Sequence, residues 1–95
     1  MSFSIQHDRT AHRFETLVED ARCELDYSLA QGAERPVMTI THTGVPARVG
    51  GRGIASALVE SALKTAREEG WRVVPACSYA AVWMQRHPAY RDLLA

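Results

Sequence analysis

The chain has 95 residues, of which 46% are hydrophobic and 23% charged, and its eleven Lys and Arg residues balance its eleven Asp and Glu residues. This composition excludes a chain that is disordered throughout, and the length predicts a single domain over residues 1–95. The zero net charge argues against nucleic acid or an anionic membrane as a partner, because both select an excess of Lys and Arg.

Four runs in the first half of the chain tend to alternate apolar and polar residues, which predicts β-strands. The runs cover residues 2–8, 13–18, 22–29 and 37–45. In the third run, Cys23, Leu25 and Tyr27 alternate with charged and polar residues, so we expect these three side chains in the core. Short polar connections favour antiparallel pairing, and the four runs therefore predict a four-stranded meander.

The second half of the chain begins with the clearest helical pattern in the sequence. From Ile54 onward, apolar residues recur every three or four positions, and the helix is expected to end at Gly70 or the residue before it. Residues 71–75 predict a short strand that pairs in parallel with an earlier one through a right-handed crossover. A last short helix is expected to have Ser78 as its N-cap and to stop at Pro88.

The two cysteines and the amino terminus bear on the location of the protein. The first eight residues lack the basic region and apolar run of a signal peptide, and no segment approaches the ~18 apolar residues of a membrane span. We expect a cytoplasmic protein with Cys23 and Cys77 as free thiols. Neither cysteine has the spacing of a metal-ligand pair, and His7, His12 and His87 suggest no ligand set, so we expect no metal site.

The segment before the long helix combines glycines with positive charge. Residues 36–58 contain no Asp or Glu, and within them stand Arg48, Val49, Gly50, Gly51, Arg52 and Gly53. Unpaired backbone N–H groups of residues 49–53 and the positive end of the helix dipole are expected to converge here, which favours a bound phosphate. The alternative is that the glycines only form a turn and that the arginines are solvated.

The motifs of this segment exclude two common kinds of phosphate-binding loop. No Walker motif can be written here, and the dinucleotide fingerprint fails because Ser56 occupies the third glycine position. The pattern Arg48-x-x-Gly51-x-Gly53 resembles the Q/R-x-x-G-x-G/A acetyl-CoA loop of the Gcn5-related N-acetyltransferase superfamily. Five ordered blocks resemble its small, single-domain branch: residues 42–46, 51–55, 66–70, 74–79 and 86–90.

The resemblance implies an α+β fold with a mostly antiparallel sheet of about five strands, one long helix after the fourth strand and one short C-terminal helix. It also implies acetyl-CoA as the cofactor. The diphosphate would lie on the backbone of residues 49–53, beside Arg48. The pantetheine arm would pair with the strand at Thr43, Gly44 and Val45, where that strand diverges from the strand of Val73.

The acetyl thioester would then point toward Cys77 and Tyr79, the two candidate catalytic residues. An amine attacks the thioester directly while Tyr79 or Cys77 protonates the departing thiolate, or Cys77 accepts the acetyl group first. We favour direct attack, with a backbone N–H near Val45 polarising the carbonyl. Both candidates are equally well explained as packing residues. His42 is the nearest candidate base and is better explained as a structural residue.

The expected partners are acetyl-CoA and an amine acceptor of unknown identity, with a protein surface among the candidates. The strands that wall the acceptor site in larger members of the superfamily are missing, so we expect an open acceptor side and a monomer or homodimer. Two other functions remain open. One is a non-catalytic module that binds acyl-CoA, and the other is an unrelated nucleotide or phosphopeptide binder that uses the same loop.

Overall fold

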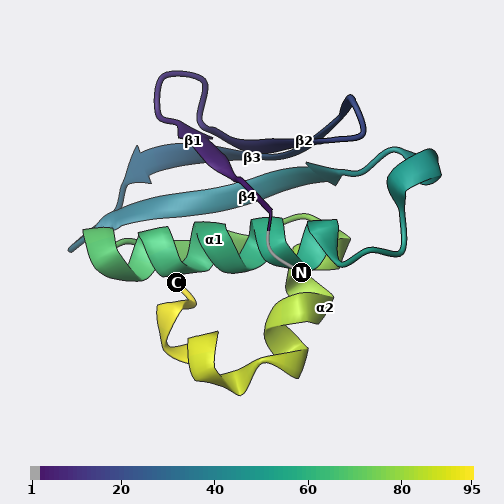
Figure 1. Ribbon diagram of the computed structural model, residues 1–95. Helices are drawn as coiled ribbons and strands as arrows, with labels where there is room; N and C mark the ends of the chain where they lie inside the picture. Colours follow the sequence, from purple (N-terminus) through teal and green to yellow (C-terminus); the bar gives the residue numbers. More distant parts are fainter. Residues whose placement is uncertain (1–2) are drawn as a thin grey trace.

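The computed structural model describes residues 3–95 and shows one five-stranded sheet with the helices gathered on one side of it (Figure 1). The strands are β1 (Gln6–Asp8), β2 (Arg13–Val18), β3 (Ala21–Gln31), β4 (Pro36–Gly44) and β5 (Arg72–Pro75), and they lie in the order of the chain. The first four pair antiparallel, and β5 pairs parallel to β4. The predicted sheet is confirmed, although its first strand begins at Gln6; Ser2, also expected there, lies outside the described residues.

The predicted long helix is α1 (Ile54–Glu69), which packs lengthwise against the sheet. Its C-cap is Gly70, whose φ of 77° is the left-handed conformation that glycine adopts without strain. The shorter α2 (Ser78–Arg86) and two 3₁₀ turns, η1 (Ala47–Val49) and η2 (Pro88–Leu93), complete the described elements. Within residues 3–95, none of the helices has the length and apolar character needed to cross a membrane.

The expected N-cap of α2 is wrong by one residue. Ser78 is the first helical residue, and Cys77 is the N-cap, with its Sγ accepting a hydrogen bond from the Ala80 N–H at 3.4 Å. The backbone explains the difference, because Cys77 is still extended and its own N–H donates to the Ile40 carbonyl. Hydroxyl side chains are the usual N-caps, so the sequence favoured Ser78 over a thiol.

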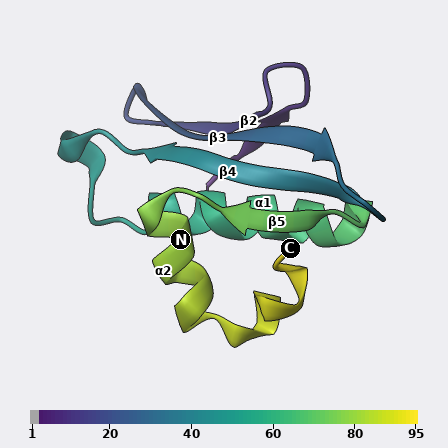
Figure 2. The same cartoon turned by 180° about the vertical axis from the view of Figure 1, so that it is seen from behind.

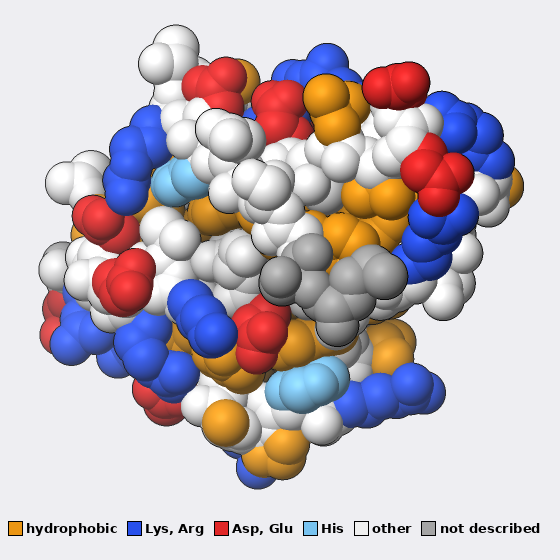
Figure 3. All heavy atoms as spheres, viewed as in Figure 1, with side chains coloured by type: hydrophobic (Ala, Val, Ile, Leu, Met, Phe, Trp, Pro, Cys, Tyr) orange, Lys and Arg blue, Asp and Glu red, His pale blue; other side chains and the backbone are white. Residues whose placement is uncertain are grey.

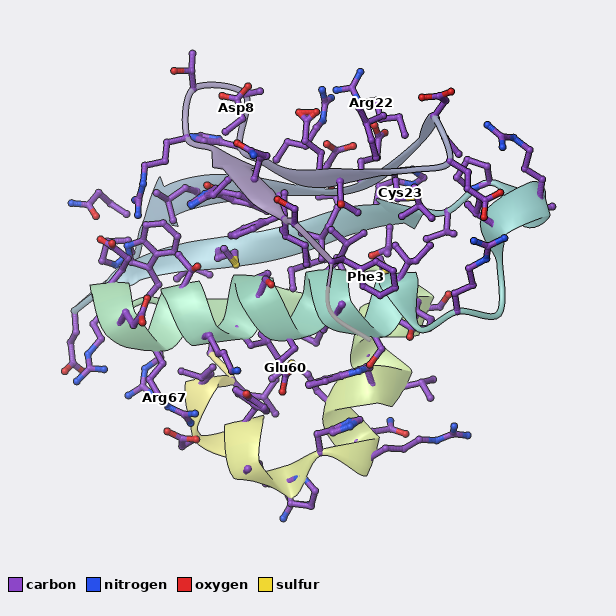
Figure 4. The ribbon with its side chains drawn as sticks, viewed as in Figure 1. Phe3, Asp8, Arg22, Cys23, Glu60 and Arg67 are labelled. Carbon is purple, nitrogen blue, oxygen red and sulfur yellow. The ribbon has the colours of Figure 1, made fainter. Side chains whose placement is uncertain are left out.

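The core lies between α1 and the sheet face that α1 covers. It includes Leu25 and Ile40 from the strands and Leu58 from α1, all with no exposed surface. Cys23 is also fully buried, as its alternation predicts, and burial raises the pKa of its thiol. Its neighbour Arg22 points away from α1, on the face that no described helix covers (Figure 4). The period-2 pattern of β3 therefore correctly separates the two faces.

A β-bulge in β4 changes which residues face α1. Asp26 pairs with His42 and Tyr27 pairs with Ile40, so Thr41 is an additional residue without a partner in register on β3. Thr43 pairs with Leu25, whose side chain is buried on the α1 side. The bulge therefore places Thr43 on the same side as Ile40 and turns His42 to the opposite face.

Candidate functional site

The site begins where β4 and β5 separate. Their parallel ladder ends at the pair Ile40 and Pro75, after which the N–H groups of Ala76 and Cys77 both donate to the Ile40 carbonyl at 3.0 Å. Figure 2 shows β4 continuing past this point toward η1, whereas the chain after β5 turns down into α2. Within residues 3–95, the end of β4 consequently has no strand paired on its β5 side. The expected divergence of these two strands is confirmed.

Cys77 and Thr43 lie on the two sides of this divergence. Thr43 Oγ1 is 3.5 Å from Cys77 Sγ, and the thiol is partly buried against the core. Cys77 is a free thiol, as is Cys23. The structure thus brings together a residue expected along the pantetheine path and a residue expected at the thioester, although 34 positions separate them in the sequence. The hydrogen bond from Ala80 further fixes the position of the sulfur atom.

The glycine loop joins η1 to α1, and its amides differ from the expectation. The Val49 N–H donates to the Pro46 carbonyl at 3.1 Å, and the Gly50 N–H donates to the Ala47 carbonyl at 3.0 Å. The prediction that these two groups are unpaired is therefore wrong, because η1 uses both of them. Val49 is also fully buried, so its side chain anchors the loop to the core.

The backbone N–H groups that follow η1 remain available to a ligand. Within residues 3–95, the N–H groups of Gly51, Arg52 and Gly53 donate no hydrogen bond. The first backbone bond of α1 runs from the Ala57 N–H to the Gly53 carbonyl, so the N–H groups of residues 54–56 have no acceptor in the preceding turn. Gly51 and Gly53 have φ values of 76° and 82°, which aim this run of N–H groups without steric strain.

The charges around the loop include an acid that no local pattern in the sequence predicts. Arg52 forms an ion pair with Glu19, which lies in the turn between β2 and β3. The hydrogen bond and charge of Arg52 lower the pKa of Glu19, and the charge of Arg48 lowers it further. Arg48 is exposed and forms no ion pair within residues 3–95. Figure 3 shows acidic and basic side chains interspersed over this face of the molecule.

A shallow depression of about 250 Å³ lies at the loop. It is lined by Val45, Gly50, Gly51, Gly53, Ile54, Ala55 and Tyr79. A Cβ built on Gly51 or Gly53 would meet no atom within 4 Å, so the backbone stands open to a ligand there. Tyr79 projects from the first turn of α2, 42% exposed, and forms one wall. The structure thus places one candidate catalytic residue beside the loop and the other, Cys77, at the strand divergence.

His42 lies on the other face of the sheet. Possible ligand atoms of Glu24, Asp26 and His42 fall within 4.8 Å of one another, a grouping that depends on strand register and that the sequence did not indicate. Arg13 already donates to Asp26 at 2.7 Å, and Arg22 lies 3.5 Å from Glu24. These contacts describe an ion-pair network on the uncovered face of the sheet.

Comparison with known proteins gives one family match. The model of a family described as "GCN5-related N-acetyl-transferase" matches residues 13–93 of this chain. No curated protein sequence matches the chain significantly.

Solved structures resemble the fold. A GCN5-like putative N-acetyltransferase from Staphylococcus aureus is 24% identical, with a TM-score of 0.74 over all of this chain and 91% of that one. A ribosomal-protein-alanine N-acetyltransferase from Brucella melitensis biovar Abortus 2308 is 20% identical, with a TM-score of 0.55 over 93% of this chain and 64% of that one. A putative acetyl transferase from Pyrococcus furiosus is 23% identical, with a TM-score of 0.51 over 79% of this chain and 56% of that one. At these identities the likeness shows the fold alone.

Proposed function

Because the chain belongs to the GCN5-related N-acetyltransferase family, we propose that it transfers an acetyl group from acetyl-CoA to an amine. One observation carries this proposal beyond the family match. The free amides of the glycine loop open into a depression directly beside the divergence of β4 and β5. The proposed diphosphate site would therefore lie next to a strand edge that no strand within residues 3–95 pairs, and a coenzyme with a diphosphate and an amide-containing arm needs both.

The residues of the loop fit the diphosphate. In this proposal the N–H groups of Gly51, Arg52 and Gly53, together with the positive end of the α1 dipole, bind its oxygens. Arg48 adds a charge that no ion pair within residues 3–95 occupies. Val49 and Gly50 shape the loop rather than donate to the ligand, because their amides are already used in η1.

The arm of the coenzyme would run along β4 from the loop to the divergence. Val45 lines the depression at the loop end of this path, and Thr43 stands at the other end, 3.5 Å from the Cys77 sulfur. Gly44 lies between them, and the His42 ring occupies the space beside it, since a Cβ built on Gly44 would lie 2.8 Å from His42 Nε2. The acetyl thioester would consequently lie close to Cys77.

The chemistry that this arrangement supports is direct aminolysis. The amine nitrogen forms a bond to the acetyl carbon, the carbon–sulfur bond breaks, the nitrogen gives up a proton to water and the departing thiolate takes one. We assign the donation of that proton to Tyr79, which follows Cys77 by two residues at the start of α2 and whose hydroxyl forms no hydrogen bond within residues 3–95. Cys77, held by Ala80 and Thr43, forms the wall of the acetyl site.

Calorimetry and thiol release test the proposal together. We expect the protein to bind CoA and acetyl-CoA in preference to ATP, and to release free thiol from acetyl-CoA when an amine acceptor is present. Preferential binding of ATP would refute the assignment of the loop. Coenzyme binding without thiol release for any amine in a panel of small amines and lysine peptides would instead indicate a module that only holds acyl-CoA.

Two variants distinguish direct attack by the amine from transfer of the acetyl group through Cys77. Tyr79→Phe is expected to lower kcat at least tenfold with little change in CoA affinity, because it removes only the hydroxyl. Cys77→Ala is expected to retain most of the activity. Loss of turnover in Cys77→Ala, together with an acetylated Cys77 in the wild-type protein by mass spectrometry, would show that the acetyl group passes through the thiol.

A further inference from the structure

We propose that the groove between α1 and α2 is a second anion subsite, in which Arg86 binds the phosphate on the ribose of the coenzyme. This inference rests on the proposed function, because it concerns the nucleotide end of the same ligand. The loop at Gly51 would hold the diphosphate in the middle of the molecule. The subsite would then decide whether the protein distinguishes CoA from its analogue without the 3′-phosphate.

The groove adjoins the loop depression. It has a volume of about 240 Å³ and is lined by Ser56, Tyr79, Val82, Trp83, Arg86 and His87. Tyr79 also lines the depression at the loop, so the two hollows meet at its side chain. A ligand whose diphosphate lies on the loop can therefore extend past Tyr79 into the groove without crossing a buried element.

The order of residues along α2 determines which end of the coenzyme would reach the groove. Cys77 begins the helix at the strand divergence, Tyr79 stands beside the loop, and Arg86 is the last helical residue. At 1.5 Å per residue, Arg86 lies about 10 Å farther along the helix axis than Tyr79. Since the thioester end would lie at Cys77, the opposite end of the ligand is the part directed toward Arg86.

The walls of the groove are fixed by contacts between the two helices. The Trp83 indole N–H donates to Ser56 Oγ at 2.8 Å, which ties α2 to α1. The His87 ring stacks on Trp83 with centroids 3.6 Å apart, and its Nδ1–H donates to the Trp83 carbonyl at 2.7 Å. Tyr79 and Val82 are 42% and 43% exposed, and they offer apolar surface against which a flat base can pack.

The charge of the groove suits an anion. Neither α2 nor the lining of the groove contains an acidic residue. Arg86 is exposed and makes no ion pair within residues 3–95, in contrast to Arg67 on α1, which pairs with Asp92. Figure 3 shows basic and histidine side chains at this end of α2. A phosphate in the groove would supply the partner that Arg86 lacks, and a guanidinium binds phosphate through two parallel hydrogen bonds.

The test is a comparison of CoA with 3′-dephospho-CoA by calorimetry on the wild-type protein, Arg86→Gln and Arg91→Gln. Arg91 is a matched control, because it is also exposed and unpaired within residues 3–95 but lines a different hollow. We expect the wild type to bind CoA roughly tenfold more tightly than dephospho-CoA. Arg86→Gln should bind CoA roughly tenfold more weakly and dephospho-CoA nearly as well as the wild type does, and Arg91→Gln should behave like the wild type.

Each of the other outcomes contradicts either the subsite at Arg86 or the proposed function. If the wild type binds CoA and dephospho-CoA equally, or if Arg86→Gln weakens both ligands to the same extent, the subsite is wrong and the loop assignment stands. If Arg91→Gln loses the discrimination as fully as Arg86→Gln, general electrostatics account for it and the subsite is again wrong. If the wild type binds neither ligand, the proposed function itself fails.

Discussion

Gly51 allows the charge requirement of the loop to be tested apart from its shape. Its φ is 76°, and a Cβ built there would meet nothing within 4 Å. Asp and Asn tolerate this left-handed conformation better than most other side chains, and they have nearly the same size. Gly51→Asp and Gly51→Asn therefore share one backbone strain and one steric effect, and they differ by a single negative charge.

That charge would stand close to the proposed diphosphate. Two unit charges about 5 Å apart interact by roughly 3 kcal/mol at an effective dielectric constant near 20, and a tenfold change in affinity corresponds to about 1.4 kcal/mol. Because solvent screens an exposed loop, we expect less than this full value. Gly51→Asp should bind CoA at least roughly tenfold more weakly than Gly51→Asn at low salt, and the difference should shrink as salt shortens the Debye length.

Calorimetric titration of both variants with CoA, at low and high salt, measures the difference. Thermal unfolding serves as the control, since the two variants should have similar Tm values if their strain is the same. Equal CoA affinities for Gly51→Asp and Gly51→Asn at low salt, from variants that remain folded, would refute the claim that the loop amides bind a phosphate group.

Three further predictions concern other parts of the chain. Glu19→Gln should tighten CoA binding about threefold at low salt, because it frees Arg52 for the ligand. Weaker binding by calorimetry would instead mean that Glu19 holds Arg52 in the position needed for binding. Burial, then the charge of Arg9, lowers the pKa of His7 below its ordinary 6.5. The unfolded chain thus takes up the His7 proton first, so Tm should fall as pH drops from 6.5 through the lowered value, and His7→Gln should flatten that part of the Tm profile. Leu58→Ala, at a fully buried position, should cost about 2–5 kcal/mol and lower Tm by roughly 10 °C or more in differential scanning calorimetry.

The elements with strong local signals were predictable from sequence. The helical spacing from Ile54 and the glycine at position 70 gave both ends of α1, and the alternation around Leu25 gave the buried face of β3. These features depend on residues that are close together in the sequence, so local patterns predict them. The glycine loop was predictable for the same reason, since its residues are consecutive.

Two of the features that the sequence did not predict depend on distant pairings. Glu19 reaches Arg52 across 33 residues, and no local pattern indicates that the turn between β2 and β3 will neutralise part of the loop's charge. The bulge at Thr41 is also set by its partner strand, so the face occupied by His42 could not be read from alternation alone. The use of the Val49 amide within η1 is instead a local feature, and it follows from backbone conformation rather than residue type.

The candidate site depends on how β5 ends as much as on the glycine motif. After Pro75, the next two N–H groups both donate to a single acceptor, the Ile40 carbonyl. The strand pairing therefore stops while β4 continues, and Cys77 enters α2 opposite Thr43. Any substitution that lets β5 pair farther along β4 would cover the edge on which the proposed ligand lies. Residues 74–79 should accordingly constrain the function even though the sequence there contains no recognised phosphate-binding motif.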